Sequence, residues 1–154
     1  MKEIYKKYIE LININYRNSE AFSDSEMFLS SLHNQGKKLV LVTSSRAEMC
    51  LPIIEKFKWK RYFSDYVWGD DVNHSKPSPY IYFEACRRVG VQKEQIVVIE
   101  DSLNGVKSAH TAGLSVFGLS IYFSEDDLRK SGASKIYKNL RPVSYTHLTL
   151  PTKR

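Results

Sequence analysis

Short apolar runs alternate with helix-like segments along this chain of 154 residues, and that alternation limits the possible folds more than any other feature. The runs at 39–42 (LVLV) and 96–99 (IVVI) are rich in β-branched residues and have no polar face. Such runs are typical of strands that are buried on both sides of a parallel sheet. Strands that alternate with helices indicate an α/β fold with a doubly wound, Rossmann-like parallel sheet.

Capping and turn residues predict where the elements begin and end. Gly36 follows the second helix-like segment at the position where glycine readily adopts a left-handed conformation. Gly90 is expected to end a later helix, and Pro79 suits the first turn of that helix. One of Ser23, Asp24 and Ser25 is expected to cap the second helix. The expected elements are helix 3–15, a helix from the cap to about 34, strand 38–43, helix 46–57, strand 66–68, a helix ending near 89, strand 95–99, helix 103–111, strand 115–119 and a helix capped by Ser124.

Composition excludes several classes of protein. No apolar run approaches the roughly 20 residues that a membrane-spanning helix needs, and the first residues lack the apolar stretch of a secretory signal. Cys50 and Cys86 have no metal-binding spacing, which indicates free, half-buried thiols and a cytoplasmic location. The net charge of +6 comes from scattered Lys and Arg residues, so neither a nucleic-acid partner nor a membrane partner is expected.

Polar residues stand where the predicted strands end, and in an open parallel sheet ligands collect at that edge. Thr43, Ser44 and Ser45 follow the first of the two apolar runs and directly precede a helix. Their hydroxyl and backbone N–H groups suit a phosphate dianion, although serine and threonine are also ordinary helix caps. The residues alone leave both interpretations open.

Lys76 and the pair Glu100 and Asp101 are the other candidates. Lys76 lies between a polar loop and a stiff Pro-Ser-Pro turn, where it can neutralise a phosphoryl group as a point charge or remain a solvated surface lysine. Glu100 and Asp101 lie at the tip of a buried strand, where adjacent carboxylates repel each other unless a cation or donors compensate them. Mg²⁺ prefers one or two carboxylates together with phosphate oxygens, so the pair favours a magnesium site.

Three stretches in this order, LVLVTSSR, HSKPSPYIYFEACRRVG and IVVIEDSLNGVKSAHTAGL, resemble the haloacid dehalogenase-like hydrolase superfamily and in particular its β-phosphoglucomutase and sugar-phosphatase branch. The resemblance covers roughly residues 1–140. It implies that residues 21–141 form an incomplete α/β core of this type, and that residues 1–20 are the last helix of a helical cap and its return to the core. It also implies phosphoryl transfer from a small phosphate ester through an aspartyl-phosphate, with Mg²⁺ as cofactor.

The resemblance also assigns roles to individual residues. Thr43 would donate to the phosphoryl oxygens, assisted by the backbone N–H of Ser44. Lys76 would stabilise charge on the nucleophile and on the transferring group. Glu100 and Asp101 would hold or orient the metal.

The substrate side is less determined by the motifs. Ser45 and Arg46 would touch a distal phosphate, or would merely begin an exposed helix. Tyr80 departs from the superfamily, which usually has aspartate there, and is expected to support the loop. The expected partner is a small phosphorylated metabolite, a sugar phosphate above all, with no obligate protein partner. Both phosphatases and mutases share these motifs, and the cap that would discriminate them is mostly absent.

The nucleophile of the superfamily is missing from the chain. It is the first aspartate of an Asp-x-Asp motif that ends the first strand, upstream of all the motifs found. Asp24 follows a polar segment, and Asp70 and Asp71 come after Thr43, in the wrong order. The missing strand would lie at the centre of the sheet, so its two neighbours must either pair directly or leave open edges. Because covalent catalysis by this route needs the carboxylate, the chain is expected to be inactive alone.

Residues 142–154 have no counterpart in the resemblance and are expected to be a foreign or disordered tail, so we interpret the chain as a fragment. The first hypothesis is a fragment of a Mg²⁺-dependent phosphatase or phosphomutase. The alternative is a catalytically silent module that binds phosphate or Mg²⁺ without turnover. A phospho-acceptor receiver domain is excluded, because its acidic pair would come first in the chain and its lysine last.

Overall fold

The computed structural model describes residues 3–4, 6–8, 10–11 and 18–145, and over this range strands alternate with helices. The strands are β1 (Leu39–Val42), β2 (Phe63–Val67), β3 (Val97–Glu100), β4 (Ser115–Leu119) and β5 (Lys135–Tyr137). The helices are α2 (Ser25–Asn34), α3 (Ala47–Lys56), α4 (Tyr80–Val89), α5 (Leu103–Thr111), α6 (Glu125–Lys130) and α7 (Arg141–Tyr145). Single turns of 3₁₀ helix are η1 (Trp59–Arg61), η2 (Gly69–Asp71) and η3 (Lys93–Gln95). None of the described helices has the length and apolar character needed to cross a membrane.

Most element boundaries agree with the sequence prediction. α5 and β4 have the predicted bounds, Gly90 ends α4 with a φ of 69°, and Ser124 caps α6 through its side chain. β2 begins at Phe63, earlier than predicted, because the exposed Ser64 can lie on an edge strand that is not buried on both faces. β5 and α7 were not predicted, and both are short.

The strands form two separate parallel sheets. β1 pairs with β2, from Leu39 opposite Phe63 to Val42 opposite Val67. In the second sheet β4 lies between β3 and β5 and pairs with both. In the described part of the chain no strand pairs with the second edge of β1 or of β3. Of the two arrangements left open by the sequence, the structure therefore has the open edges.

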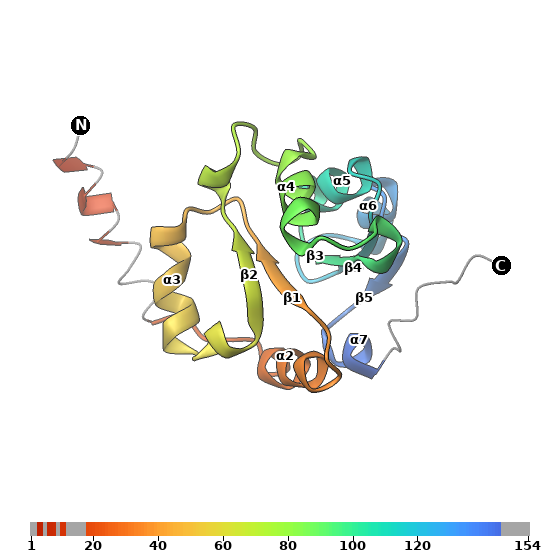
Figure 1. Cartoon of the computed structure of the whole chain (residues 1–154), viewed down its shortest axis with the longest axis horizontal. Coiled ribbons are helices and arrows are strands. Elements are labelled where there is room, and N and C mark those ends of the chain that lie inside the picture. The colour runs from red at the N-terminus through yellow and green to blue at the C-terminus, as the bar shows by residue number, and fades with distance from the viewer. Residues whose placement is uncertain (1–2, 5, 9, 12–17, 146–154) are drawn as a thin grey trace.

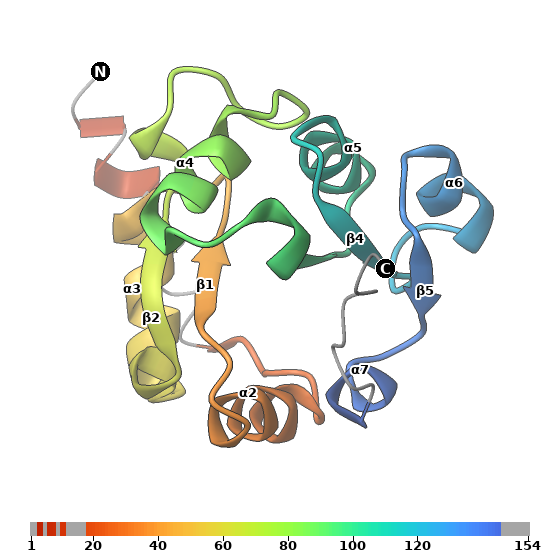
Figure 2. The ribbon, with the colours of Figure 1, turned by 45° about the vertical axis from the view of Figure 1, so that its right-hand side comes forward.

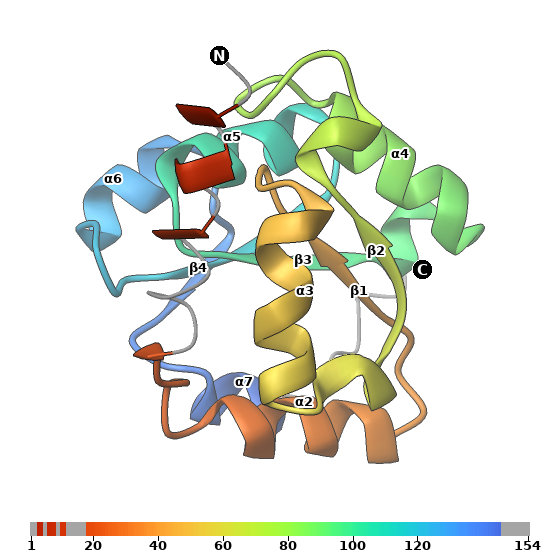
Figure 3. The same ribbon diagram turned by 90° about the vertical axis from the view of Figure 1, so that its left-hand side faces the viewer.

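Helices cover both sides of the strands, and the sheets are joined through them (Figure 1). α2 and α7 pack against each other on one side, and α4 and α5 contact each other on the opposite side (Figure 2). α3 flanks the β1–β2 sheet (Figure 3). Side chains of β3 alternate between the two faces: Val98 belongs to an apolar cluster with α4 and α5, whereas Val97 and Ile99 contact a cluster with α2 and α7. The two sheets are thus held together by side-chain packing and not by backbone hydrogen bonds between their strands.

Asp24 links the start of α2 to the C-terminal helix. Asp24 is the N-cap residue of α2, but its side chain makes no capping hydrogen bond there. Its Oδ2 instead accepts hydrogen bonds from the N–H groups of Leu140 (2.7 Å) and Arg141 (3.2 Å). Val143 in α7 is fully buried, although it falls within the segment that was expected to be a foreign or disordered tail. Residues 146–154 lie outside the described residues, and the foreign origin of this end stays a prediction.

The described residues of the N-terminal segment are helical at 3–4, 6–8 and 10–11. Ile4, Tyr8 and Leu11, which share one face of the predicted helix, are exposed, and Ile12 lies outside the described residues. The assignment of residues 1–20 to a cap stays a prediction.

Arg88 ties α4 to the β1–β2 sheet. Its guanidinium donates to the Tyr66 carbonyl oxygen (2.7 Å) and to Glu84 (2.6 Å), and it pairs with Asp71 at 3.0 Å. Glu84 also accepts two hydrogen bonds from Arg87. Hydrogen bonds from Arg87 and Arg88 lower the pKa of Glu84 to about 2.

Glu84→Gln should therefore destabilise the protein in a pH-dependent way. Because the pKa of Glu84 is lower in the folded state than its ordinary value of 4.5, its contribution is complete above pH 4.5 and is lost as the pH falls towards 2. We expect the melting temperature of Glu84→Gln to lie below that of the unaltered protein at pH 7, with the difference shrinking over this range in circular dichroism melts. Glu94→Gln, at an exposed carboxylate, is the control and should change little. A difference that stays constant with pH would contradict the assignment.

Candidate active site

The loop after β1 is fixed to the end of β2 by backbone hydrogen bonds. The Thr43 N–H donates to the Val67 carbonyl oxygen (3.0 Å), and the Gly69 N–H donates to the Ser45 carbonyl oxygen (2.9 Å). A side chain at position 69 would not fit, because its Cβ would lie 2.0 Å from the Ser44 carbonyl oxygen. These contacts hold Thr43 in one place at the carboxyl end of β1.

The hydroxyl residues of this loop do not cap α3. The N-cap residue of α3 is Arg46, and no side-chain capping hydrogen bond is present. Thr43 Oγ1 accepts a hydrogen bond from the Ser45 N–H at 3.1 Å, which uses an oxygen lone pair and leaves the hydroxyl proton able to donate. Donors of the kind that bind a phosphate are therefore available at this strand end.

Lys76 is not a solvated surface lysine. Its side chain is only 10% exposed, and its Nζ donates to Glu100 Oε1 in an ion pair with a carboxylate that is 8% exposed. The Lys76–Pro77 peptide bond is cis. The structure thus brings two of the predicted site residues into direct contact at the carboxyl end of β3.

Tyr82 of α4 contacts both members of this ion pair. Its hydroxyl donates to Glu100 Oε1 at 2.6 Å, and its ring centroid lies 5.1 Å from Lys76 Nζ. Burial and the neighbouring Glu100 carboxylate raise the pKa of Tyr82, so the phenol stays protonated and remains a donor. Sequence reasoning missed Tyr82; the available signal was its place beside Ile81 and Ala85 on the buried face of α4.

The second carboxylate oxygen of Glu100 faces the start of α5. Ser102 Oγ donates to Glu100 Oε2 at 3.2 Å and accepts from the Gly105 N–H at 3.0 Å. A Cβ at position 105 would lie 2.0 Å from Oε2, so only glycine leaves room for the carboxylate. Ser102 and Gly105 also escaped the sequence prediction, although a serine directly before a helix is a recognisable cap.

Asp101 is half-buried beside Glu100, and no hydrogen bond or ion pair of its carboxylate occurs among the described residues. Within the same residues, no group of three or more His, Cys, Asp and Glu side chains could hold a metal ion. Mg²⁺ is commonly held by one or two carboxylates together with water and phosphate oxygens. The pair Glu100 and Asp101 supplies the protein part of such a set, so the donors present fit Mg²⁺.

The remaining predicted residues lie nearer the surface. Arg46 is exposed and lies within ion-pair distance of Glu48 (3.7 Å) and Asp70 (3.8 Å), and Ser45 beside it is half-buried. The exposed ring of Tyr80 contacts that of His74 in the preceding loop, with centroids 5.2 Å apart. This contact is consistent with a role in supporting the loop.

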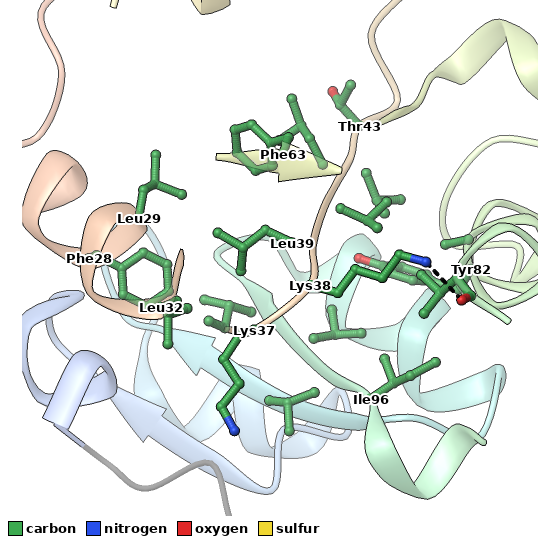
Figure 4. A pocket seen from close by; sticks show the side chains of 18 of the residues that line it. Phe28, Leu29, Leu32, Lys37, Lys38, Leu39, Thr43, Phe63, Tyr82 and Ile96 are labelled. Atoms are coloured by element: carbon green, nitrogen blue, oxygen red, sulfur yellow. Dashed lines mark hydrogen bonds between the residues drawn. The ribbon is translucent and has the colours of Figure 1, made fainter. Parts of the chain in front are cut away.

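A cavity of about 670 Å³ lies where neither β1 nor β3 has a partner. Its lining includes every residue of β1 and residues 96–99. Figure 4 shows apolar side chains around it, with Thr43 and Tyr82 on different sides. The labelled lining residues are Phe28, Leu29, Leu32, Lys37, Lys38, Leu39, Thr43, Phe63, Tyr82 and Ile96. Thr43 and Tyr82 therefore line the same cavity, and Tyr82 also contacts the Lys76–Glu100 ion pair.

Known proteins are similar to this chain in sequence. The family model of the haloacid dehalogenase-like hydrolases matches residues 1–119. Phosphoglycolate phosphatase of Salmonella typhimurium is 35% identical over 92 residues, and a phosphorylated carbohydrates phosphatase of Thermotoga maritima is 37% identical over 83 residues. The alignments cover 60% and 53% of this chain, but only 36% and 38% of those two proteins.

Solved structures are similar as well. A candidate beta-phosphoglucomutase from Thermotoga maritima superposes with a TM-score of 0.72 at 30% sequence identity. The superposition covers 76% of this chain and 55% of the Thermotoga protein. CbbY from Rhodobacter sphaeroides superposes with a TM-score of 0.79 at 24% sequence identity, over 90% of this chain and 64% of CbbY. This match shows a similar fold. Since the family model matches well over half of the sequence, the chain belongs to the haloacid dehalogenase-like hydrolases.

Proposed function

We propose that this chain carries part of the active site of a Mg²⁺-dependent enzyme that transfers the phosphoryl group of a small phosphate ester. The observation that carries the proposal is the buried Lys76–Glu100 pair, with Asp101 beside it and Thr43 on the adjoining cavity. A cation and hydroxyl donors held in a site that excludes water stabilise the charge of a transferring phosphoryl group. Relatives named for phosphoglycolate and for phosphorylated carbohydrates support a small phosphorylated metabolite, above all a sugar phosphate, as substrate.

Each predicted residue has a role in this proposal. The Thr43 hydroxyl and the Ser44 N–H donate to phosphoryl oxygens, and the Lys76 ammonium neutralises charge on the same group. Asp101 and Glu100 would hold or orient the metal. When bound, Mg²⁺ would supply positive charge that stabilises the transferring phosphoryl group. Ser45 and Arg46 would contact a distal group of the substrate.

The proposal places the nucleophile outside this chain. Transfer through an aspartyl-phosphate needs a carboxylate oxygen that attacks phosphorus while the ester oxygen leaves, and then water or a second hydroxyl that takes the phosphoryl group. A strand that paired with the open edges of β1 and β3 would occupy the cavity and carry such a carboxylate to the end where Thr43 lies. The open edges, the cavity and the 36–38% coverage of the relatives support this view. The chain as given is expected to be inactive.

A second function is a catalytically silent module that binds phosphate or Mg²⁺ without turnover. The donors at Thr43 and the carboxylate of Asp101 support binding even when no nucleophile is present. The two functions differ in the sequence encoded upstream of Met1. The cytoplasmic location stays a prediction in both.

The first experiment is to sequence the DNA on both sides of this reading frame. If an in-frame strand ending in Asp-x-Asp lies upstream, the extended protein should hydrolyse p-nitrophenyl phosphate only when Mg²⁺ is present. The 154-residue chain should show no turnover under the same conditions. In the extended protein Lys76→Met should lower kcat about 100-fold or more, as expected for loss of a group that stabilises charge in the transition state.

Lys130→Met, which removes an exposed lysine of α6, is the matched control and should leave kcat unchanged. Turnover that persists without Mg²⁺, or that ignores Lys76→Met, would refute the enzyme proposal. A stop codon directly upstream of Met1 would instead favour the silent module. Titration of the chain with inorganic phosphate and Mg²⁺ would then decide whether it binds either.

A further inference from the structure

Tyr82 is a buried titratable side chain to which the proposed phosphoryl transfer gives no task. It is 3% exposed, and its ring and hydroxyl contact different members of the buried ion pair. Tyr66 offers a contrast: its hydroxyl is buried and has no hydrogen-bond partner within the part of the chain that the structure describes. Burial of a tyrosine thus does not by itself produce the contacts of Tyr82.

The contacts of Tyr82 converge on a single carboxylate oxygen. Glu100 Oε1 accepts from both the Tyr82 hydroxyl and Lys76 Nζ, while Oε2 accepts from Ser102. Three donors from different segments therefore set the orientation of Glu100, and the absence of a side chain at Gly105 leaves room for its carboxylate. Because the ammonium of Lys76 also lies over the Tyr82 ring, it is held by attraction to the ring face as well as by Glu100.

We propose that Tyr82 is a positioning residue of this site, whose hydroxyl and ring together hold the Glu100 carboxylate and the Lys76 ammonium in one arrangement. The part that Lys76 then plays in phosphoryl transfer rests on the proposed function, whereas the positioning does not. Without the hydroxyl, Glu100 loses a neutral side-chain donor and the ion pair samples more orientations. Lys76 then spends more time accessible to reagents in solution.

Amine acetylation of the 154-residue chain tests the positioning directly. Tyr82→Phe removes only the O–H group and keeps the ring beside the ammonium. After brief treatment with acetic anhydride, peptide mass spectrometry gives a rate for each lysine. We expect the rate at Lys76 to rise several-fold in Tyr82→Phe, with no change at the exposed Lys130. Tyr66→Phe deletes a buried hydroxyl that has no hydrogen-bond partner among the described residues, and it should leave the acetylation rate at Lys76 unchanged.

Titration with Mg²⁺ alone gives a second readout that a purely structural tyrosine would not move. Loss of a group that orients a metal-site carboxylate commonly weakens metal binding by about 10-fold or more, and we expect that change for Tyr82→Phe but not for Tyr66→Phe. If the chain binds no Mg²⁺ while Tyr82→Phe still exposes Lys76, the metal site of the proposed function fails and the positioning stands. Equal acetylation of Lys76 in Tyr82→Phe and in the unaltered chain would overturn the positioning.

Should Tyr82→Phe fail to fold, the unaltered chain still answers the question by NMR. A Tyr82 hydroxyl proton that exchanges slowly with water supports the proposal. A proton that exchanges as fast as that of the exposed Tyr122 overturns it.

Discussion

Lys76→Met is expected to lower the free energy of unfolding by about 3–5 kcal/mol, the usual cost of removing one member of a buried ion pair. Glu100 is 8% exposed, and without Lys76 the side-chain donors left to its negative charge among the described residues are the neutral hydroxyls of Tyr82 and Ser102. The isolated charge is costly because protein and not water surrounds it. Urea denaturation at pH 7, followed by circular dichroism, measures the loss.

Two further variants distinguish the effect of leaving Glu100 unpaired in a buried position from the general effect of removing a lysine. Lys130→Met breaks an ion pair with Asp126 in which both side chains are more than 70% exposed, and it should cost less than about 1 kcal/mol. Adding Glu100→Gln to Lys76→Met should restore part of the lost stability, because no unpaired charge then remains. A loss for Lys76→Met as small as that for Lys130→Met would show that water reaches the pair.

Gly69→Ala should produce the second large effect, a loss of about 3 kcal/mol or more, at the upper end of the cost of overpacking. The new Cβ would lie 2.0 Å from the carbonyl oxygen of Ser44 and 2.6 Å from its carbon. These are backbone atoms and cannot swing aside as a side chain can. The loop that carries Thr43 must shift, and the hydrogen bond from Gly69 to Ser45 breaks. Urea denaturation gives the stability, and amide chemical shifts of residues 43–46 report the displacement.

Gly118→Ala is the matched control for this variant. Its Cβ would first meet the Cβ of Ala133 at 3.2 Å, a side-chain atom that a small adjustment relieves. We expect a loss of about 1 kcal/mol, at the low end of overpacking costs, and no shift at residues 43–46. Equal losses for the two variants would mean that the close approach of Gly69 to Ser44 does not hold in solution.

Local residue chemistry made much of the fold predictable. The apolar run of β3, the cap at Ser124 and the left-handed Gly36 depend on a few neighbouring residues, and the structure has all of them. β5 was missed because three residues are too short to establish a period, and it exists through its pairing with β4. Asp24 was one of three residues considered as the side-chain cap of α2, but the partners of its carboxylate lie 116 and 117 residues away, beyond the reach of any local pattern.

The candidate site divides in the same way. Lys76, Glu100 and Asp101 could be named from residue type and motif, yet the sequence left Lys76 either solvated or functional. Its burial follows from the contact that Glu100 and Tyr82 make with it, 24 and 6 positions along the chain. Tyr82 was missed because an aromatic residue on the buried face of a helix usually only fills the core, and a sequence does not show where a hydroxyl points.

Because β1 and β3 are not paired with each other, the two sheets share no backbone hydrogen bond in the described part of the chain. The hydrogen bonds of one sheet can break while those of the other stay intact. Amide hydrogen exchange should therefore show two cooperative units, one containing β1 and β2 and the other β3, β4 and β5. The slowest amides should belong to β4, the strand that is paired on both sides. A segment bound between the sheets would merge the two units, and β1 and β3 would then exchange as slowly as β4.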